Sequence, residues 1–348
     1  MPDPLSADKG ISMARVDFRF LNRSEVKALL PSPKDLLEVI EKGLAAHGRK
    51  DVVLPPKSHI DLDDRYNGHF NILVGWAGPI DTAGVKVIGD YVDNYKEGLP
   101  SEIAILNLYN PRNGIPLAVM DATDLTTERT GAVTAVGAKF LAPPSPRVLG
   151  HIGARGTAYA NIALLAHLFP LDEVRINSRR RETRDALAQK VSKELGLRTI
   201  PVESAELACR GADIVVEATR LERPTVLIHD EWLSPNCLLV TYGWKMAVDP
   251  VTVRTAAKIV VDDWEQCCRG GQLFPMIESG ELTRSSIHAE IGEIAAGLKA
   301  GRSPEDGRIV FWHRGFSISD IMLGSYVLDR ARHANSGTTL NLFDRPAE

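Results

Sequence analysis

Apolar positions between residues 32 and 121 change from helical to strand-like spacing. Leu37, Ile40 and Leu44 lie three and four positions apart, which predicts a helix over residues 32–47. The runs that follow have strand character, and the Pro, Asn and Gly residues of 110–114 predict a turn between two antiparallel strands. The expected strands span residues 68–74, 83–88, 102–109 and 116–121.

The pattern changes again at the proline-rich residues 142–146, which follow a helix of small residues expected at 126–141. A strand at 147–152 and a helix at 157–169 then begin a regular alternation. Because strands separated by helices are joined by right-handed crossovers, this alternation predicts a parallel sheet. The later strands are expected at 173–177, 198–201, 214–218, 238–241 and 257–261, with helices at 181–195 and 204–210.

The 348 residues therefore divide into two predicted domains of the α/β class. The last amphipathic helix, 319–334, has Ser319 as its expected N-cap and should return to pack against the N-terminal part. Residues 1–124 and 319–348 are expected to form an α+β domain that includes this helix. Residues 125–318 are expected to form a Rossmann-type parallel-sheet domain, the kind that binds dinucleotides.

Composition and charge fit an ordinary globular protein and exclude several function classes. The net charge of -4 gives no electrostatic basis for binding nucleic acid or an anionic membrane. No apolar run approaches the roughly 20 residues of a membrane span, and residues 1–13 lack the layout of a secretory signal. The four cysteines show no metal-site spacing. We expect a cytoplasmic protein without a nucleic-acid partner, a membrane partner or a metal.

Residues 152–158 form a glycine-containing loop between the first strand and first helix of the second domain. In the pattern G-x-G-x-x-A, Gly153 and Ala158 occupy the first and third positions, but Arg155 replaces the second glycine. Either Gly156 lets the backbone approach a phosphate that Arg155 pairs with, or Arg155 fills space that a cofactor needs. We adopt the first interpretation because a helix N-terminus favours an anion. The expected cofactor-binding residues are Gly153, Arg155, Gly156, Thr157 and Ala158.

No acidic residue follows the second strand of this domain. Ser178 and Arg179 occupy the place where NAD-binding domains often carry an acid for the ribose, and arginine there accommodates a 2′-phosphate. Arginines that open a helix are also a common solvated face. We expect the cofactor to be NADP or NAD, with a preference for NADP, and Ser178 and Arg179 to contribute to its binding.

The segment 114–142 carries the most specific motif. It begins Gly-Ile-Pro-Leu-Ala-Val-Met-Asp, continues as Leu-Thr-Thr-Glu-Arg-Thr at 125–130 and ends in the helix of small residues. It resembles the ornithine cyclodeaminase/mu-crystallin family, whose signature is G-x-P-x-A-x-x-D, then L-T-x-x-R-T and a small-residue helix. The resemblance covers most of the chain, including Gly315 and Asp320 near its end. It implies a homodimer formed through the first domain's sheet, a nicotinamide-binding second domain and chemistry on amino acids or cyclic imines.

The same resemblance assigns roles to three residues. Lys86 falls on the family's active-site lysine, and Arg129 on the arginine that binds the substrate carboxylate; Thr130 joins the expected cofactor-binding residues. Arginine grips a carboxylate bidentately, and a lysine screened from water can act as an acid or base. Without the resemblance, Arg129 would be an ion-pair partner of Glu128 or Asp124, and Lys86 an ordinary strand lysine facing solvent.

Several positions depart from the family pattern. Lys57 replaces an arginine that adds to carboxylate binding, so the charge is kept but the bidentate geometry is lost. The stretch 240–245 lacks the aspartate of cyclodeaminases, and no acid follows until Asp249. His313 replaces a serine expected near the nicotinamide and either titrates near neutrality as a proton donor or is a packing histidine. Trp244 and His313 indicate a more aromatic pocket and a substrate other than ornithine.

The leading hypothesis is an NAD(P)-dependent imine reductase or amino-acid dehydrogenase acting on a small amino or imino acid. In it, Arg129 and Lys57 hold the carboxylate, Lys86 manages the proton and the cofactor carries the hydride step. The missing aspartate argues against full cyclodeamination, so an ornithine cyclodeaminase-type ammonia lyase is the alternative enzyme. A ligand-binding homologue without turnover, suggested by Arg155 in the cofactor loop, is the alternative from another class.

Overall fold

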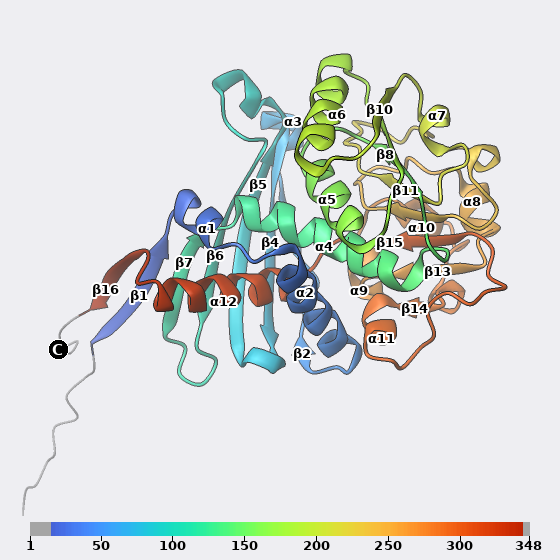
Figure 1. Cartoon of the computed structure of the whole chain (residues 1–348). Coiled ribbons are helices and arrows are strands. Elements are labelled where there is room, and N and C mark those ends of the chain that lie inside the picture. Colours follow the sequence, from blue (N-terminus) through green and yellow to red (C-terminus); the bar gives the residue numbers. More distant parts are fainter. Residues whose placement is uncertain (1–14, 344–348) are drawn as a thin grey trace, which may run out of the picture.

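The structure, a computed structural model, describes residues 15–343 and is built on two eight-stranded sheets (Figure 1). The first sheet takes its strands from the two ends of the described chain and the second from the middle. The predicted fold class, a Rossmann-type parallel-sheet domain beside an α+β domain, is confirmed. The domain boundaries proposed at residues 124 and 318 stay a prediction.

The first sheet is antiparallel apart from one parallel pair, β1 with β7. Its strand order is β16 (Thr338–Phe343), β1 (Val16–Leu21), β7 (Pro116–Asp121), β6 (Glu102–Tyr109), β5 (Thr82–Tyr91), β4 (Gly68–Ala77) and β2 (Val52–Val53), and β3 (Ser58–Asp61) pairs with β4. The predicted antiparallel hairpin around 110–114 is therefore confirmed as β6–β7.

Helices cover one face of this sheet. Figure 1 shows α12 crossing strands β4 to β6, with α2 and α4 beside it. The helices of this half are α1 (Arg23–Leu29), α2 (Pro33–Gly48), α3 (Asp63–Tyr66), α4 (Thr123–Leu141) and α12 (Ser317–His333), with short 3-10 helices η1 (Gly78–Ile80) and η2 (Val92–Glu97). The expected return of the last helix to the first half is confirmed.

Register fixes which side chains face those helices. Lys86, Leu106 and Met120 pair in successive strands and are all fully buried. Neighbours one position along point to the opposite face, as side chains alternate along a strand, and Ile105 there is 50% exposed. The helix-covered face therefore carries both the core and Lys86, and the other face is open in the single chain.

The second sheet is entirely parallel, as predicted. Its order is β10 (Thr199–Val202), β9 (Glu173–Asn177), β8 (Val148–Ile152), β11 (Ile214–Glu217), β12 (Leu238–Thr241), β15 (Ile309–Trp312), β13 (Lys258–Val261) and β14 (Ala289–Glu290). Its helices are α5 (Ala158–Leu168), α6 (Arg181–Leu195), α7 (Ala205–Cys209), α8 (Pro250–Arg254), α9 (Trp264–Cys267), α10 (Phe274–Glu278) and α11 (Ile291–Ala295), with η3 (Asp230–Trp232) and η4 (Arg284–Ser286).

Two details differ from the sequence-based expectations. The last helix begins at Ser317 with Phe316 as N-cap, so the prediction of Ser319 as the cap is wrong. The Ser319 hydroxyl instead donates to the Phe316 carbonyl from within the first turn. Strand β15 was not expected, because its four apolar residues, all buried, show no alternation. No helix of the described part of the chain is long and apolar enough to cross a membrane.

Candidate active site

Three elements bring a lysine, an arginine and an aspartate together beneath the first sheet's helices. The Lys86 ammonium, from β5, donates to Asp320 Oδ1 of α12 at 2.7 Å and to Thr126 Oγ1 of α4 at 3.2 Å. Arg129 Nε, one turn along α4, donates to the same Asp320 oxygen at 3.1 Å. All three charged groups are buried. The structure thus unites Lys86 and Arg129, as expected, and adds Asp320 as their common partner.

The cluster holds two cations against one carboxylate, an arrangement that favours an anionic ligand. The other carboxylate oxygen, Asp320 Oδ2, is buried and has no hydrogen-bond partner among the described residues. Nor do the two terminal nitrogens of Arg129 bond to any described residue. A buried unsatisfied polar atom costs about 1–3 kcal/mol, which makes this a site with unused binding capacity rather than a completed structural ion pair.

The amine of Lys86 is set to exchange a proton near neutral pH. Burial and the neighbouring Arg129 charge lower the pKa of Lys86 to about 8, although Asp320 opposes this shift. Strongly perturbed lysines of this kind are typical of catalytic positions. The alternatives from sequence are wrong here: Lys86 does not face solvent, and the carboxylate paired with Arg129 belongs to Asp320, since Asp124 pairs with Arg23.

Lys57 lies on the segment that joins β2 and β3 and reaches the same region. Its ammonium donates to the Arg314 carbonyl at 2.9 Å, and its backbone N–H donates to Gln266 Oε1 at 3.1 Å. Asp262 holds the 314–315 turn by accepting from both backbone N–H groups. Burial and the Arg314 charge hold the pKa of Lys57 well below its usual range. The structure therefore places Lys57 near Arg129, on a support that sequence reasoning had not identified.

His313 is a packing histidine. It is buried, its Nε2 lies 3.0 Å from Thr134 Oγ1, and its ring stacks on Tyr242 at 4.6 Å between centroids. Burial, with the charges of Arg129 and Lys57, lowers the pKa of His313 to about 3. This surrounding favours packing over titration near neutrality, because a charged imidazolium is unfavourable when buried beside other cations.

The loop after β8 has the geometry of a tight strand-to-helix turn. Gly153 adopts φ +107°, and a Cβ there would lie 2.6 Å from the Ala218 carbonyl oxygen, so only glycine fits. A Cβ added at Gly156 would meet nothing within 4 Å. Arg155 is exposed and makes no hydrogen bond or ion pair with the described residues. Helix α5 begins at Ala158, directly after the exposed residues Arg155 and Gly156 and the half-buried Thr157.

A polar network that sequence reasoning missed supports this loop. The Tyr242 hydroxyl lies 2.6 Å from Thr157 Oγ1, and Asn161 Nδ2 donates to that hydroxyl at 2.6 Å. Asn161 also lies 3.1 Å from His151 Nε2, and His151 Nδ1 donates to the Gly153 carbonyl. The loop is therefore fixed from below while its outer side stays open.

The remaining expected residues are Ser178 and Arg179 of the parallel-sheet half and Thr130, which follows Arg129 on α4. Ser178 is half-buried, with its hydroxyl 3.3 Å from Thr183 Oγ1, and Arg179 is exposed without a bond to described residues. Thr130 is buried, and its hydroxyl donates to the Thr126 carbonyl of its own helix. Residues 240–245 contain no acid, but buried Glu217 of the adjacent strand β11 accepts a hydrogen bond from the Thr241 hydroxyl at 2.9 Å.

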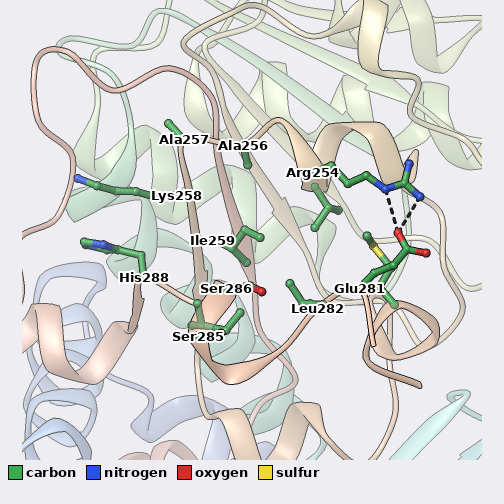
Figure 2. Close-up of a pocket in the computed structure, with 13 residues that line it drawn as sticks. Arg254, Ala256, Ala257, Lys258, Ile259, Glu281, Leu282, Ser285, Ser286 and His288 are labelled. Carbon is green, nitrogen blue, oxygen red and sulfur yellow. Dashed lines mark hydrogen bonds and ion pairs between the residues drawn. The ribbon is translucent and has the colours of Figure 1, made fainter. Parts of the chain in front are cut away.

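Two other features lie outside this site. A surface hollow of about 470 Å³ is lined by α8, β13 and the 281–288 segment, with the Arg254–Glu281 ion pair at its side (Figure 2). Its lining includes none of the residues of the charge cluster. The buried trio of His47, Asp263 and Glu290 is close enough to bind an ion. However, His47 bonds to Asp263 at 2.9 Å, and Glu290 already accepts from protein donors, so these groups link the two halves.

Known proteins resemble the chain over nearly its whole length. The family model described as ornithine cyclodeaminase/mu-crystallin matches residues 17–335. An alanine dehydrogenase of Archaeoglobus fulgidus is 31% identical over 329 residues, covering 93% of this chain and 98% of that protein. An archaeal alanine dehydrogenase dimer solved with bound NAD is 28% identical with TM-score 0.87, covering 94% of this chain and 100% of the other.

A second solved structure extends the comparison to a cyclic substrate. The Δ1-pyrroline-2-carboxylate reductase of Thermococcus litoralis, in complex with NADH and L-proline, is 28% identical with TM-score 0.86. The match covers 92% of this chain and 99% of that one. Both solved relatives contain a nicotinamide dinucleotide, and one contains an amino acid.

Proposed function

The chain belongs to the ornithine cyclodeaminase/mu-crystallin family, and we propose that it interconverts a small amino acid and its imine with a nicotinamide cofactor. It is accordingly an NAD(P)-dependent oxidoreductase, either an imine reductase or an amino-acid dehydrogenase. The observation that carries the proposal is the buried cluster of Lys86, Asp320 and Arg129, with its excess cation and unsatisfied carboxylate oxygen.

The substrate carboxylate is assigned to Arg129. The terminal nitrogens of Arg129 have no partner among the described residues, while its Nε is fixed by Asp320, so the free edge is already oriented. A planar guanidinium can bind a carboxylate by donating two parallel hydrogen bonds to its oxygens. Lys57 adds an amine on the same side, held by the Arg314 carbonyl. An amino or imino acid bound in this way has its nitrogen close to Lys86.

Lys86 then moves the proton at the substrate nitrogen. In reduction, the imine nitrogen must gain a proton, and the ammonium of Lys86 supplies it; in oxidation, the neutral amine takes a proton back. A pKa of about 8 keeps both forms of Lys86 accessible near neutrality. Asp320 orients the amine and stabilises its charged form. Exclusion of water by α12 and α4 keeps this exchange between Lys86 and the substrate.

The residues of the second sheet fit a dinucleotide. The open space at Gly156, the N-terminus of α5 and the exposed Arg155 would hold its phosphates, with Gly153, Thr157 and Ala158 shaping the turn. When bound, the nicotinamide supplies or accepts the hydride. Thr130 stays a proposed neighbour of the cofactor. Exposed Arg179 beside Ser178, with no acid there, favours NADP over NAD.

The open face of the first sheet supports a homodimer. It exposes large apolar side chains that point to the same face from different strands, with Phe20 of β1 at 39%, Ile103 of β6 at 42% and Leu340 of β16 at 40% exposure. Contiguous apolar patches on a soluble chain mark interaction surfaces, and a self-complementary patch gives a two-fold dimer. A related alanine dehydrogenase was solved as a dimer. A sedimentation mass of one chain would contradict this assignment.

We place the protein in the cytoplasm. Its four cysteines are free, and three of them, Cys209, Cys237 and Cys267, are buried. Free thiols persist in a reducing compartment.

The test begins with a titration of the protein with NADPH and with NADH, in which the fluorescence of the nucleotide reports binding. Saturable binding followed by nicotinamide oxidation with a panel of cyclic imines, or with keto acids plus ammonia, is the expected result. Binding without turnover of any panel member would support a non-catalytic homologue. Ammonia release from ornithine would mean that the protein is a cyclodeaminase and not a reductase. Buried Glu217, beside the 240–245 loop, would then be the available acid.

A further inference from the structure

An aromatic contact joins the two halves of the molecule at the edge of the proposed site. Trp244 lies on the loop after β12, and its ring centroid is 5.3 Å from that of His59 on β3 and 6.4 Å from that of His69 on β4. The two histidine rings are themselves 6.4 Å apart. A side chain from the parallel-sheet half therefore rests on two from the antiparallel half. No step proposed above uses these three residues.

The Trp244 ring is held firmly although it is 42% exposed. Gly270, at φ +135°, lies so close that a Cβ there would be 2.8 Å from the ring. The Arg314 guanidinium packs over the ring face, 4.8 Å from the centroid, and is fixed by a hydrogen bond to the Gln266 carbonyl. A large indole that is fixed in place yet partly uncovered is a surface prepared for a ligand.

Strand register places the aromatic wall formed by Trp244, His59 and His69 on the same face of the first sheet as Lys86. On β4, Leu73 pairs with Lys86 of β5, and His69, an even number of positions away, points to the same face of the sheet. His59 pairs with Asn71 of β4, which shares that face. The face that carries Lys86 under the helices thus continues to the two histidines that meet Trp244.

Arg314 connects the wall to the carboxylate side of the site. Its guanidinium contacts Trp244, while its carbonyl accepts from the Lys57 ammonium at 2.9 Å. Partial burial and the charges of Lys57 and Arg314 lower the pKa of His59 to about 4, so this ring is neutral at physiological pH. The wall is therefore aromatic, built of three rings tilted against one another, with the Arg314 guanidinium packed over the indole.

We propose that Trp244, seated on His59 and His69, is the specificity-determining residue of the site and packs against the side chain of the amino or imino acid. The inference rests on the proposed function: with the carboxylate at Arg129 and the nitrogen at Lys86, the third substituent extends along this face. A flat or apolar side chain gains contact with the indole. An ammonium-bearing side chain, as in a diamino acid, is repelled by Arg314 and Lys57.

The test compares two unreactive carboxylates: pyrrole-2-carboxylate, which offers the wall a planar ring, and propionate, which is small, flexible and has no ring. Dissociation constants are measured calorimetrically on the full chain, with and without NADPH, for wild type, Trp244→Ala and Trp244→Phe. Trp232→Phe is the matched control, because Trp232 of η3 packs on His229, the N-cap of that helix, and makes no ring contact with the wall residues. Circular dichroism and melting temperature confirm that each variant is folded.

Wild type is expected to bind pyrrole-2-carboxylate about tenfold more tightly than propionate, the scale of an aromatic contact plus ring burial. Trp244→Ala should abolish that preference, with propionate changed less than about twofold, whereas Trp244→Phe should keep most of it. In turnover, Trp244→Ala should raise KM for a cyclic imine and leave kcat nearly unchanged.

Equal weakening of both probes by Trp244→Ala, or no weakening, would overturn the assignment. So would a wild-type protein that does not prefer the planar probe. These binding ratios need no catalysis, so they decide the role of Trp244 even if the imine panel shows no turnover and the proposed function fails. Tight binding of ornithine would also contradict it, because the Arg314 guanidinium at the wall should exclude such a side chain.

Discussion

On the proposed substrate side, Lys86 and Arg129 are buried and both paired with buried Asp320, whereas on the proposed cofactor side Arg155 and Arg179 are exposed and unpaired among the described residues. Buried charges cost free energy unless partnered, so removing one disturbs both folding and chemistry. Exposed charges cost little and act only when a ligand arrives. The comparison predicts large, coupled effects on one side and small, separable effects on the other.

The largest effect is expected from Lys86→Ala. Loss of the group that moves the proton should lower kcat by about 10³-fold, within the range for general acid–base residues, while nucleotide binding stays within about twofold. Steady-state kinetics and NADPH titration measure the two. The control is Lys139→Ala, which removes an exposed lysine of α4 that pairs with Glu41 of α2. Retained turnover in Lys86→Ala would remove this lysine from the mechanism.

Asp320→Asn should next show that the substrate side couples stability to chemistry. It leaves two buried cations without their carboxylate, and breaking a buried pair costs about 3–5 kcal/mol of unfolding free energy. Asp329→Asn on the same helix removes only an exposed partner of Arg332 and should cost less than about 0.5 kcal/mol. Urea denaturation measures both. Equal, small losses of unfolding free energy in the two variants would mean that Asp320 does not stabilise the buried Lys86 and Arg129.

The pH dependence sharpens the same point. Because reduction uses the ammonium of Lys86, kcat/KM for imine reduction should fall as pH rises through about 8, and oxidation of the amino acid should rise over the same interval. Asp320 raises the pKa of Lys86, so Asp320→Asn should move both profiles to lower pH. Profiles with the same slope in the two directions would contradict this assignment.

The two sides also differ in how well the sequence predicted them. The Rossmann alternation and the strand–turn–helix at Gly153 follow from local spacing and were confirmed in place. Lys86 and Arg129 were identified through the motif resemblance, and their common partner Asp320 lies 234 and 191 positions away along the chain. No local pattern reveals such a partner. An acid on the buried face of an amphipathic helix was the available signal.

His313 and Trp244 show the same limit. Residue type alone allowed His313 to titrate or to pack, and only its burial beside Arg129 and Lys57 decided for packing. The contacts of Trp244 with His59 and His69, and the exposed fraction of its ring, depend on how the two halves of the molecule pack against each other. Strand β15, which brings His313 to the site, lies between β12 and β13 against the chain order. That insertion is a tertiary fact that periodicity does not encode.

The smallest effects are expected on the cofactor side, where two arginines can be compared directly. Arg155→Ala should weaken NADPH and NADH alike, by about three- to tenfold, because both carry the pyrophosphate near α5. Arg179→Ala should weaken NADPH by a similar factor and leave NADH within about twofold, because only NADPH carries the 2′-phosphate. Melting temperatures without nucleotide should stay unchanged in both variants, since neither side chain has a partner among the described residues. Tighter nucleotide binding by Arg155→Ala would mean that this arginine fills the cofactor's space instead of pairing with its phosphate. The loop would then be an obstacle, and the proposed cofactor side would differ from the substrate side in the space that Arg155 occupies rather than in its exposure.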